Sequence, residues 1–296
     1  MKASLPHRTP RRVGLSFLLL FLAVPHSRAD EPSPAALAAF NARAAKVNGR
    51  LDAQHRSPQT FPGSLISETE TQGSLHRGEL VIEQLTPPGG EELPGALLHH
   101  WRGSAFIPGV TAAQMEQLLR DYSAYPRHYA PQVLATHILA QQSDRYQVTM
   151  RLRQQHVLTV NLDATYDVRF GRLDPAHAFS FSRSTHIDEL DSAGHPLPPA
   201  DQHGFLWQLD TWWTYAEQDG GLYVQLETLS LTRSIPTGLA WAVRPFIASV
   251  PRDSLAFTLR STANALRSDT ERAGKGRAPD GKPAKSSTPI LERTQP

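Results

Sequence analysis

Residues 207–233 read WQLDTWWTYAEQDGGLYVQLETLSLTR, and this stretch decides the fold. Its middle, residues 219–221, is Asp-Gly-Gly, and glycine supplies the positive φ that tight hairpin turns require. The segments on either side, 204–217 and 221–235, are rich in aromatic and β-branched residues, which are typical of strands. The stretch therefore predicts an antiparallel hairpin.

The first strand of this hairpin has one apolar face. Side chains alternate between the two faces of a strand, so every second residue shares a face. The apolar face carries Phe205, Trp207, Leu209, Trp213 and Tyr215, and the other face includes Gln208, Asp210 and Thr214. An apolar sheet face has to be covered by another element, because a sheet is stable only when that face is buried. We expect an amphipathic helix to cover it.

That helix is predicted at the end of the chain. Residues 237–247 predict one helical stretch, and Pro251 fits the first turn of a second helix that ends near Arg267. Helical spacing places an apolar series on one side of the second helix. The series is Leu255, Leu259, Thr262, Ala263 and Leu266.

Further strands are predicted before the hairpin. Period-two alternation and turn residues between segments indicate strands at 78–87, 96–107, 132–141, 145–154, 158–170 and 177–188. Residues 111–122 predict a helix that opens with a Thr-x-x-Gln capping box. Short connections between the later strands favour an antiparallel meander. The predicted fold class is α+β, a curved antiparallel sheet wrapped around a long C-terminal helix.

The two ends of the chain differ from this body. Residues 1–29 resemble a signal peptide, since basic residues precede an apolar run and Ser27-Arg28-Ala29 suits cleavage. Residues 30–78 predict an N-terminal helix, at about 33–47, followed by a flexible lead-in. The domain itself is expected over 79–268, and 269–296 predicts a disordered tail. The protein is therefore expected to be exported, to the periplasm or beyond, with no stable transmembrane segment after cleavage.

Composition excludes several function classes. The leader holds five basic residues and no acid, so the other residues have 25 Lys and Arg against 28 Asp and Glu, a net charge of −3. This balance gives no support to nucleic-acid binding. The absence of cysteine from the sequence excludes disulfides, thiolate metal sites and a cysteine nucleophile.

The order of these elements resembles the START-like (SRPBCC) helix-grip superfamily, which includes polyketide cyclases and coenzyme Q-binding proteins. The residues that carry the resemblance are LLRDYSAYPRHYAPQV at 118–133, the Trp-rich strand, the DGG turn and LETLSLTRSIPTGLAW at 226–241. It covers about residues 95–268. The resemblance implies a cavity between sheet and terminal helix that binds a hydrophobic or amphipathic small molecule, such as a lipid or isoprenoid, and allows transient membrane contact.

Ten residues are candidates for lining that cavity. Aromatic side chains would form its walls, and Arg183, Glu227 and Arg233 would supply polar contacts, although each of the three could instead form a structural ion pair. The full set is Trp207, Leu209, Trp213, Tyr215, Tyr166, Phe179, Phe181, Arg183, Glu227 and Arg233.

Catalysis is less expected than binding. No His-Glu-x-x-His, Gly-x-Ser-x-Gly or phosphate-loop pattern occurs in the sequence, and no cofactor or metal is expected. Asp188, Glu189 and Asp191 are read as a solvated loop rather than a calcium site, because the glycine of a calcium-binding loop is missing. Two alternatives stay open: a polyketide cyclase-like enzyme using Glu227, Tyr166 or His156, and a non-catalytic scaffold for envelope proteins.

Overall fold

The computed structural model describes residues 31–61, 69–155, 159–234 and 240–275. The described strands are β1 (Val81–Gln84), β2 (Glu91–Leu93), β3 (Ala96–Pro108), β4 (Val133–Gln142), β5 (Arg145–Gln155), β6 (Thr159–Asp174), β7 (His177–Glu189), β8 (Gln208–Gln218) and β9 (Gly221–Arg233). The described α-helices are α1 (Pro34–Gln54), α2 (Thr69–His76), α3 (Ala112–Arg120), α4 (Tyr125–His128) and α5 (Ala240–Lys275), with short 3₁₀ turns at Tyr122–Ala124 and Pro199–Asp201.

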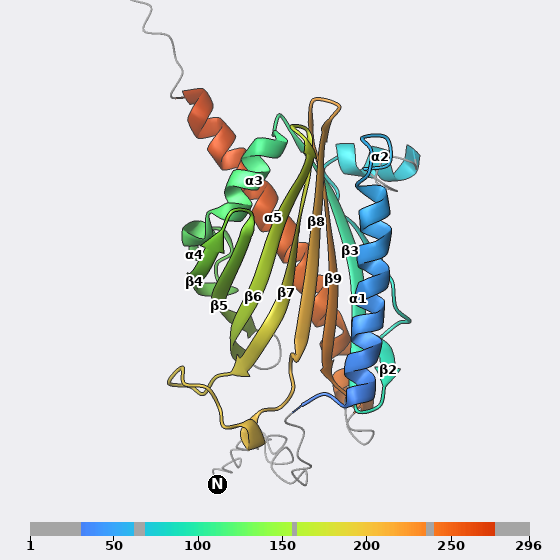
Figure 1. Ribbon diagram of the computed structural model, residues 1–296, viewed down its shortest axis with the longest axis vertical. Coiled ribbons are helices and arrows are strands. Elements are labelled where there is room, and N and C mark those ends of the chain that lie inside the picture. The colour runs from blue at the N-terminus through green and yellow to red at the C-terminus, as the bar shows by residue number, and fades with distance from the viewer. Residues whose placement is uncertain (1–30, 62–68, 156–158, 235–239, 276–296) are drawn as a thin grey trace, which may run out of the picture.

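The strands form one curved antiparallel sheet with the order β1-β3-β9-β8-β7-β6-β5-β4, and β2 also pairs with β3 (Figure 1). Consecutive strands from β4 to β9 are neighbours, as a meander requires. The longest hydrogen-bonded pairing joins β3 to β9, from Ala96 opposite Arg233 to Pro108 opposite Gly221. Together with the long C-terminal helix, this arrangement confirms the predicted α+β helix-grip fold class.

Helix α5 crosses one face of the sheet, here called the α5 face (Figure 1). Leu255 and Leu259 pack above Gly103 of β3, where a Cβ atom would come within 2.6 Å of a Leu259 methyl carbon. Glycine at this position therefore allows the helix to approach the sheet closely. The buried cluster under α5 includes Trp101, Tyr166, Trp213, Tyr215, Leu255, Leu259, Ala263 and Leu266.

The C-terminal helix is longer than predicted. Two helices were expected, at 237–247 and from Pro251 to Arg267, but α5 is one helix over Ala240–Lys275 that continues through Pro251. A proline removes one backbone donor without breaking a helix when packing holds the flanking turns. Burial of Leu255, Leu259 and Leu266 against the sheet supplies that packing.

Helix α1 covers the opposite face, here called the α1 face (Figure 1). Its buried residues recur every three or four positions, and the cap is formed by Ser33, whose hydroxyl accepts a hydrogen bond from the Ala36 amide at 3.1 Å. The chain stays packed after the helix, because Phe61 is fully buried. This differs from the flexible lead-in expected over these residues. The buried α1 residues are Ala36, Phe40, Ala44, Val47 and Leu51.

The sheet is therefore buried on both faces, which changes the meaning of the alternation in β8. Trp212, an even-numbered residue, packs under α1 and donates from its indole nitrogen to the Asn48 side chain at 2.8 Å. Trp213 and Tyr215 pack under α5. Strand β8 begins at Gln208, later than predicted, after Gly204 with its φ of +73°.

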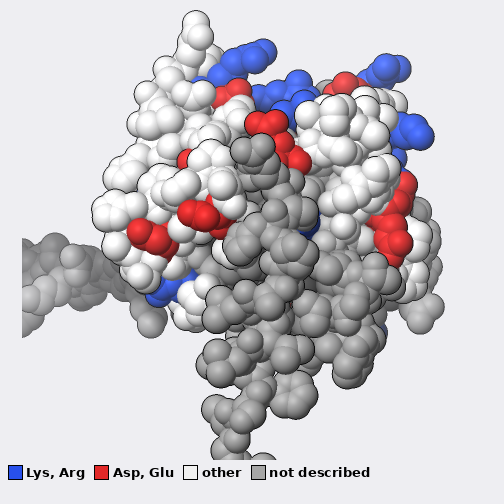
Figure 2. Space-filling view, turned by 90° about the horizontal axis from the view of Figure 1, so that it is seen from below, with Lys and Arg blue, Asp and Glu red and all other residues white. Residues whose placement is uncertain are grey.

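The surface carries charges of both signs. Figure 2 shows acidic and basic side chains interspersed around the lower end of the molecule, outside the part covered by grey atoms. Within the described residues, no helix has the length and apolar character needed to cross a membrane.

Candidate functional site

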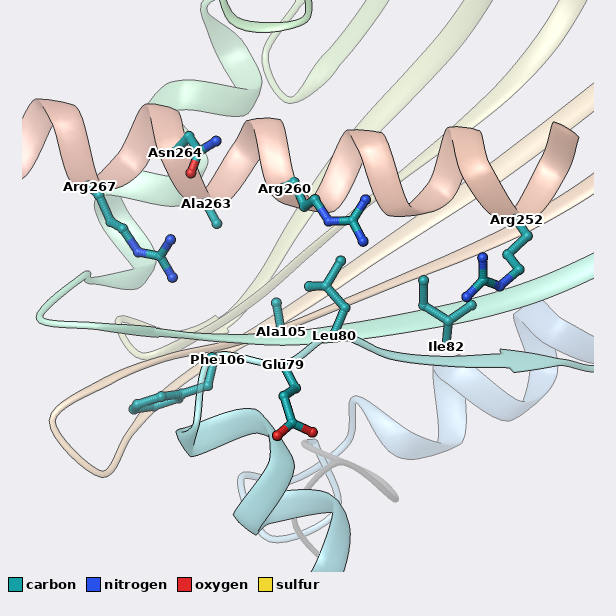
Figure 3. A pocket seen from close by; sticks show the side chains of 11 residues that line it. Glu79, Leu80, Ile82, Ala105, Phe106, Arg252, Arg260, Ala263, Asn264 and Arg267 are labelled. Carbon is teal, nitrogen blue, oxygen red and sulfur yellow. The ribbon is translucent and has the colours of Figure 1, made fainter. Parts of the chain in front are cut away.

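A groove lies between helix α5 and the edge of the sheet formed by β1 and β3 (Figure 3). Its volume is about 590 Å³, within the range of about 300–1,000 Å³ that small-molecule sites occupy. It is lined by Gly78, Glu79, Leu80, Ile82, Ala105, Phe106, Arg252, Arg260, Ala263, Asn264 and Arg267.

The floor of the groove is apolar. Leu80 and Ile82 come from the start of the β1 segment, and Ala105 comes from β3. The pairing of Ile82 with Gly103 places these residues beside the point where α5 approaches the sheet. Because β1 is an edge strand, its far side is free of further sheet pairing in the described chain, so the groove lies at the margin of the sheet. The floor can therefore contact an apolar ligand that enters from solvent.

The α5 wall of the groove is basic. Arg252, Arg260 and Arg267 extend from the helix toward the strand residues (Figure 3). Arg252 contacts its neighbour Asp253 at 3.3 Å. Among the described residues, Arg260 and Arg267 make no hydrogen bond or ion pair. Arginine is always charged at physiological pH, so the groove carries uncompensated positive charge.

The acid nearest to this wall belongs to another pair. Glu79 lines the groove, but its carboxylate points away from α5 (Figure 3) and binds Arg77 at 2.7 Å. The hydrogen bond from Arg77 lowers the pKa of Glu79, although slight desolvation opposes the change. Glu79 therefore does not neutralise the arginines of α5.

Four of the ten predicted site residues lie on the α5 face. Tyr166, Trp213 and Tyr215 are buried in the cluster under α5, and Leu209 packs against it. Burial raises the pKa of Tyr166 and of Tyr215, so both phenols are neutral at physiological pH. The Tyr215 hydroxyl has no hydrogen-bond partner in the described chain. None of these four residues lines the groove.

Four other predicted residues lie on the α1 face. Phe179 pairs with Thr214 and stacks on His55, with ring centroids 4.5 Å apart. Phe181 pairs with Trp212 and stacks on it at 5.3 Å. The sequence placed these rings in the cavity, because it gave no sign that a helix would cover the second face. The other two residues at the α1 face are Trp207, which packs against the cluster under α1, and Arg183.

Arg183 forms the structural ion pair that was the open alternative to a ligand contact. Its guanidinium donates to the Asp210 carboxylate at 2.7 Å, and the Asp210 side chain is fully buried. Burial raises the pKa of Asp210, and the hydrogen bond and charge of Arg183 oppose the rise. Arg183 is thus engaged within the protein.

Glu227 is the centre of a buried ionic cluster under α1. Its carboxylate accepts from Arg50 of α1 at 2.5 Å, His100 of β3 at 2.7 Å and Arg102 of β3 at 3.1 Å. Burial by itself would raise the pKa of Glu227, but the His100 hydrogen bond and the two arginine charges outweigh it and lower the pKa to about 2. The cluster ties the N-terminal helix to the middle of the sheet.

Arg233 lies at the end of the sheet, where its Cβ atom and the Trp207 ring both pack beside Gly204. Arg233 is the last residue of β9, pairs with Ala96, and donates from its backbone nitrogen to the Gly204 carbonyl at 2.8 Å. His156, a candidate acid or base of the cyclase alternative, lies outside the described residues. The ten residues therefore do not form one site.

Hydrogen bonds from backbone amides to the acidic side chains stabilise the loop after β7. The Glu189 carboxylate accepts from the backbone nitrogens of His203 and Phe205 at 2.9 Å, and Asp191 accepts from Ala193 and His195. No group of three or more metal-binding side chains occurs within the ranges that the structure describes. These acids shape the loop.

The groove residues were not singled out from the sequence. One signal was present: Arg260 and Arg267 are seven residues apart on a helix whose neighbouring positions are apolar. Residues at that spacing project within about 20° of each other. The sequence did not reveal that β1 lies opposite them.

Comparisons with known proteins give similarity at the level of solved structures. No family model matches the sequence, and no curated protein matches it. A STAR-related lipid transfer protein fragment from Xanthomonas axonopodis is similar, with 17% identity, a TM-score of 0.41, and coverage of 63% of this chain and 98% of that chain. Human STARD10 is 10% identical, with a TM-score of 0.42 and coverage of 71% and 82%.

A third similar structure is the Zhui aromatase/cyclase from a Streptomyces species, R1128. It is 14% identical, with a TM-score of 0.44, and the match covers 60% of this chain and 98% of that chain. A STAR-related lipid transfer protein and an aromatase/cyclase are thus among the structures similar to this chain, in agreement with the sequence resemblance. None of these three is more than 17% identical to this chain, so the similarity extends to the fold and not to the residues of the groove.

Proposed function

We propose that this protein binds an amphipathic small molecule in the groove between α5 and the β1–β3 edge of the sheet. The observation that carries the proposal is the composition of the groove: an apolar floor of Leu80, Ile82 and Ala105 faces a helix wall of exposed basic side chains. An apolar surface beside convergent polar groups is a combination that ligand pockets use, and in this groove the polar groups are a large part of the lining.

Hydrophobic burial would supply most of the affinity. Each 100 Å² of apolar surface removed from water is worth about 2.5 kcal/mol before the cost of immobilising the ligand. Leu80 and Ile82 are only half-buried in the protein, so an alkyl chain laid over them removes water from both partners. A ligand that fits need not displace any part of the core under α5.

The location differs from the one expected beneath the Trp hairpin. Trp213 and Tyr215 belong to the packed cluster that includes Leu255 and Leu259, and the groove borders this cluster at the sheet edge, where Ala263 belongs to both. The ligand is still held between sheet and terminal helix. The contacts come from the β1 side instead of the β8 side.

The test measures the binding of a neutral fluorescent probe to the protein and to variants that carry a charged side chain in the groove floor. N-phenyl-1-naphthylamine should bind the protein with increased fluorescence, and dodecanol should displace it. Leu80→Asp, or Ile82→Asp as a second variant, should lower probe affinity at least tenfold while thermal melting shows a folded protein. Ile138→Asp is the matched control, since Ile138 is an exposed apolar residue of β4, far along the sheet from the groove. Equal binding by the Leu80, Ile82 and Ile138 variants would contradict the proposal.

We also propose that the protein is exported. The support is the sequence of residues 1–29, in which basic residues precede an apolar run and a small-residue cleavage position. N-terminal sequencing of the protein from an envelope fraction should read from about Asp30. Recovery of the protein with its initial residues intact from the cytoplasm would contradict this.

A further inference from the structure

The arginines of the groove differ in how they can act together. An α-helix rises about 1.5 Å per residue, so Arg260 and Arg267 emerge about 10.5 Å apart along α5 and within about 20° of each other. Arg252 lies about 12 Å before Arg260 and is rotated by about 80° from it, since each residue turns the helix by about 100°. The geometry favours a pair at 260 and 267 over a cluster of three.

The surroundings of this pair leave both guanidinium groups available. Arg252 has Asp253 beside it, and Glu79 is held by Arg77 on the opposite wall. Arg260 and Arg267 are exposed, and neither has a hydrogen-bonded or ion-paired partner among the residues that the structure describes. Arg260 extends into the space above Leu80, and Arg267 extends farther along α5 toward the Ala105–Phe106 part of β3 (Figure 3). Two forked cationic donors at the rim of an apolar floor match an anionic group attached to an apolar chain.

We propose that Arg260 and Arg267 form an anion subsite that binds the carboxylate or phosphate of a single-chain amphipathic ligand. This inference rests on the proposed function, because it names the head group of the ligand in the same groove. The apolar chain lies on Leu80, Ile82 and Ala105, and the head group stays at the solvent-exposed rim. The ligand is a free monomer, since the arginines face the groove floor instead of projecting outward from the molecule as a membrane-docking row would (Figure 3).

The subsite predicts a preference among ligands with one tail and different heads. Dodecanoate and dodecyl phosphate, below their micelle concentrations, should bind at least tenfold more tightly than dodecanol in a calorimetric titration at low salt. Hydrogen bonds to charged groups are worth about 1.5–3 kcal/mol, which corresponds to roughly a tenfold to a hundredfold change in affinity, and exposure places this site at the lower end. The preference should shrink at 0.5 M NaCl because salt screens exposed charges.

The decisive experiment combines these ligands with charge removal. In the double variant Arg260→Gln/Arg267→Gln, both anionic ligands should lose their advantage, and dodecanol affinity should change less than twofold. Arg145→Gln is the matched control: Arg145 is an exposed arginine at the start of β5, away from the groove, and its replacement should leave the preference intact.

The outcomes separate the two proposals. If no dodecyl ligand binds, the proposed function fails. If dodecanol binds as tightly as the anionic ligands, or if the double variant keeps the preference, the anion subsite is wrong and the proposed function stands. Sedimentation with phosphatidylcholine vesicles containing phosphatidic acid tests the other source of such a head group. Binding to vesicles that needs both arginines, without binding of monomeric dodecanoate, would overturn the proposal in favour of a membrane surface.

Discussion

The arginines on the two sides of the sheet differ in whether they are paired with an acid. Under α1, Arg50 and Arg102 surround the buried carboxylate of Glu227. On α5, Arg260 and Arg267 point into an open groove with no acid bound to them in the described chain. A buried charge has to be paired, whereas an exposed charge can remain available. The comparison therefore separates arginines that hold the structure together from arginines that can meet a ligand.

The packing of the two helices shows the same contrast. Helix α1 contributes fully buried side chains, among them Phe40, to one cluster with Trp212 and Leu229 of the sheet. Helix α5 buries one side against β3 and leaves its flank toward β1 open. A region built for stability should lose free energy of unfolding when altered. A region built for binding should lose affinity instead.

The largest expected effect is on the α1 face. Phe40→Ala should lower the free energy of unfolding by about 3–5 kcal/mol, because it leaves a cavity where a fully buried ring packs against the sheet. Urea unfolding followed by tryptophan fluorescence measures the change. Phe205→Ala is the control, since Phe205 is 39% exposed, and it should cost far less. A loss below about 1 kcal/mol for Phe40→Ala would mean that α1 is not an integral part of the fold.

A smaller loss of stability is expected at acidic pH. The pKa of Glu227 is lowered from 4.5 to about 2, so the folded state prefers the ionised carboxylate. The corresponding stability is fully present above about pH 4.5 and is lost as the pH falls toward 2. A shift of this size corresponds to about 3 kcal/mol.

Unfolding measured from pH 6 to pH 2 checks this linkage against Glu227→Gln. The variant should be less stable than the wild type at pH 6, since Arg50, His100 and Arg102 lose their common acceptor. The difference between the two proteins should shrink as the pH falls. A difference that stays constant down to pH 2 would show that Glu227 is not the linked group. If Glu227 were instead the acid or base of a cyclase-like enzyme, its replacement would leave the stability nearly unchanged.

Much of the fold could be predicted from the sequence because its signals are local. Period-two alternation and turn residues gave strands whose ends lie within a few residues of β3 and β5 to β7, and the Thr111 capping box of α3 is present, with its hydroxyl accepting from the Gln114 amide at 3.2 Å. The Asp219-Gly220 turn was readable for the same reason, since both residues have positive φ. These features depend on neighbours in the chain.

The environment of each strand face was harder to predict, because it depends on which distant segment of the chain covers that face. The segment that includes Phe40 is rich in alanine and gave no strong indication that it would cover the sheet. Without that cover, Phe179 and Phe181 were assigned to a cavity. The ion pair between Glu227 and Arg50 could not be predicted, because the two residues are 177 positions apart in the sequence. The groove combines residues 80–82 with 252–267, a contact that no periodicity encodes.

The smallest expected change in stability comes from replacing the arginines of the groove. Arg260→Gln/Arg267→Gln should change the free energy of unfolding by no more than about 0.5 kcal/mol, as exposed substitutions without partners usually do. Arg102→Gln, which removes a donor to the buried Glu227, should cost more than about 1 kcal/mol. Both variants remove arginine charge, so urea unfolding of the two proteins in one buffer isolates the role of the buried acceptor. If the groove variant were the less stable of the two, Arg260 and Arg267 would be structural residues, and their exposure would no longer argue for a ligand.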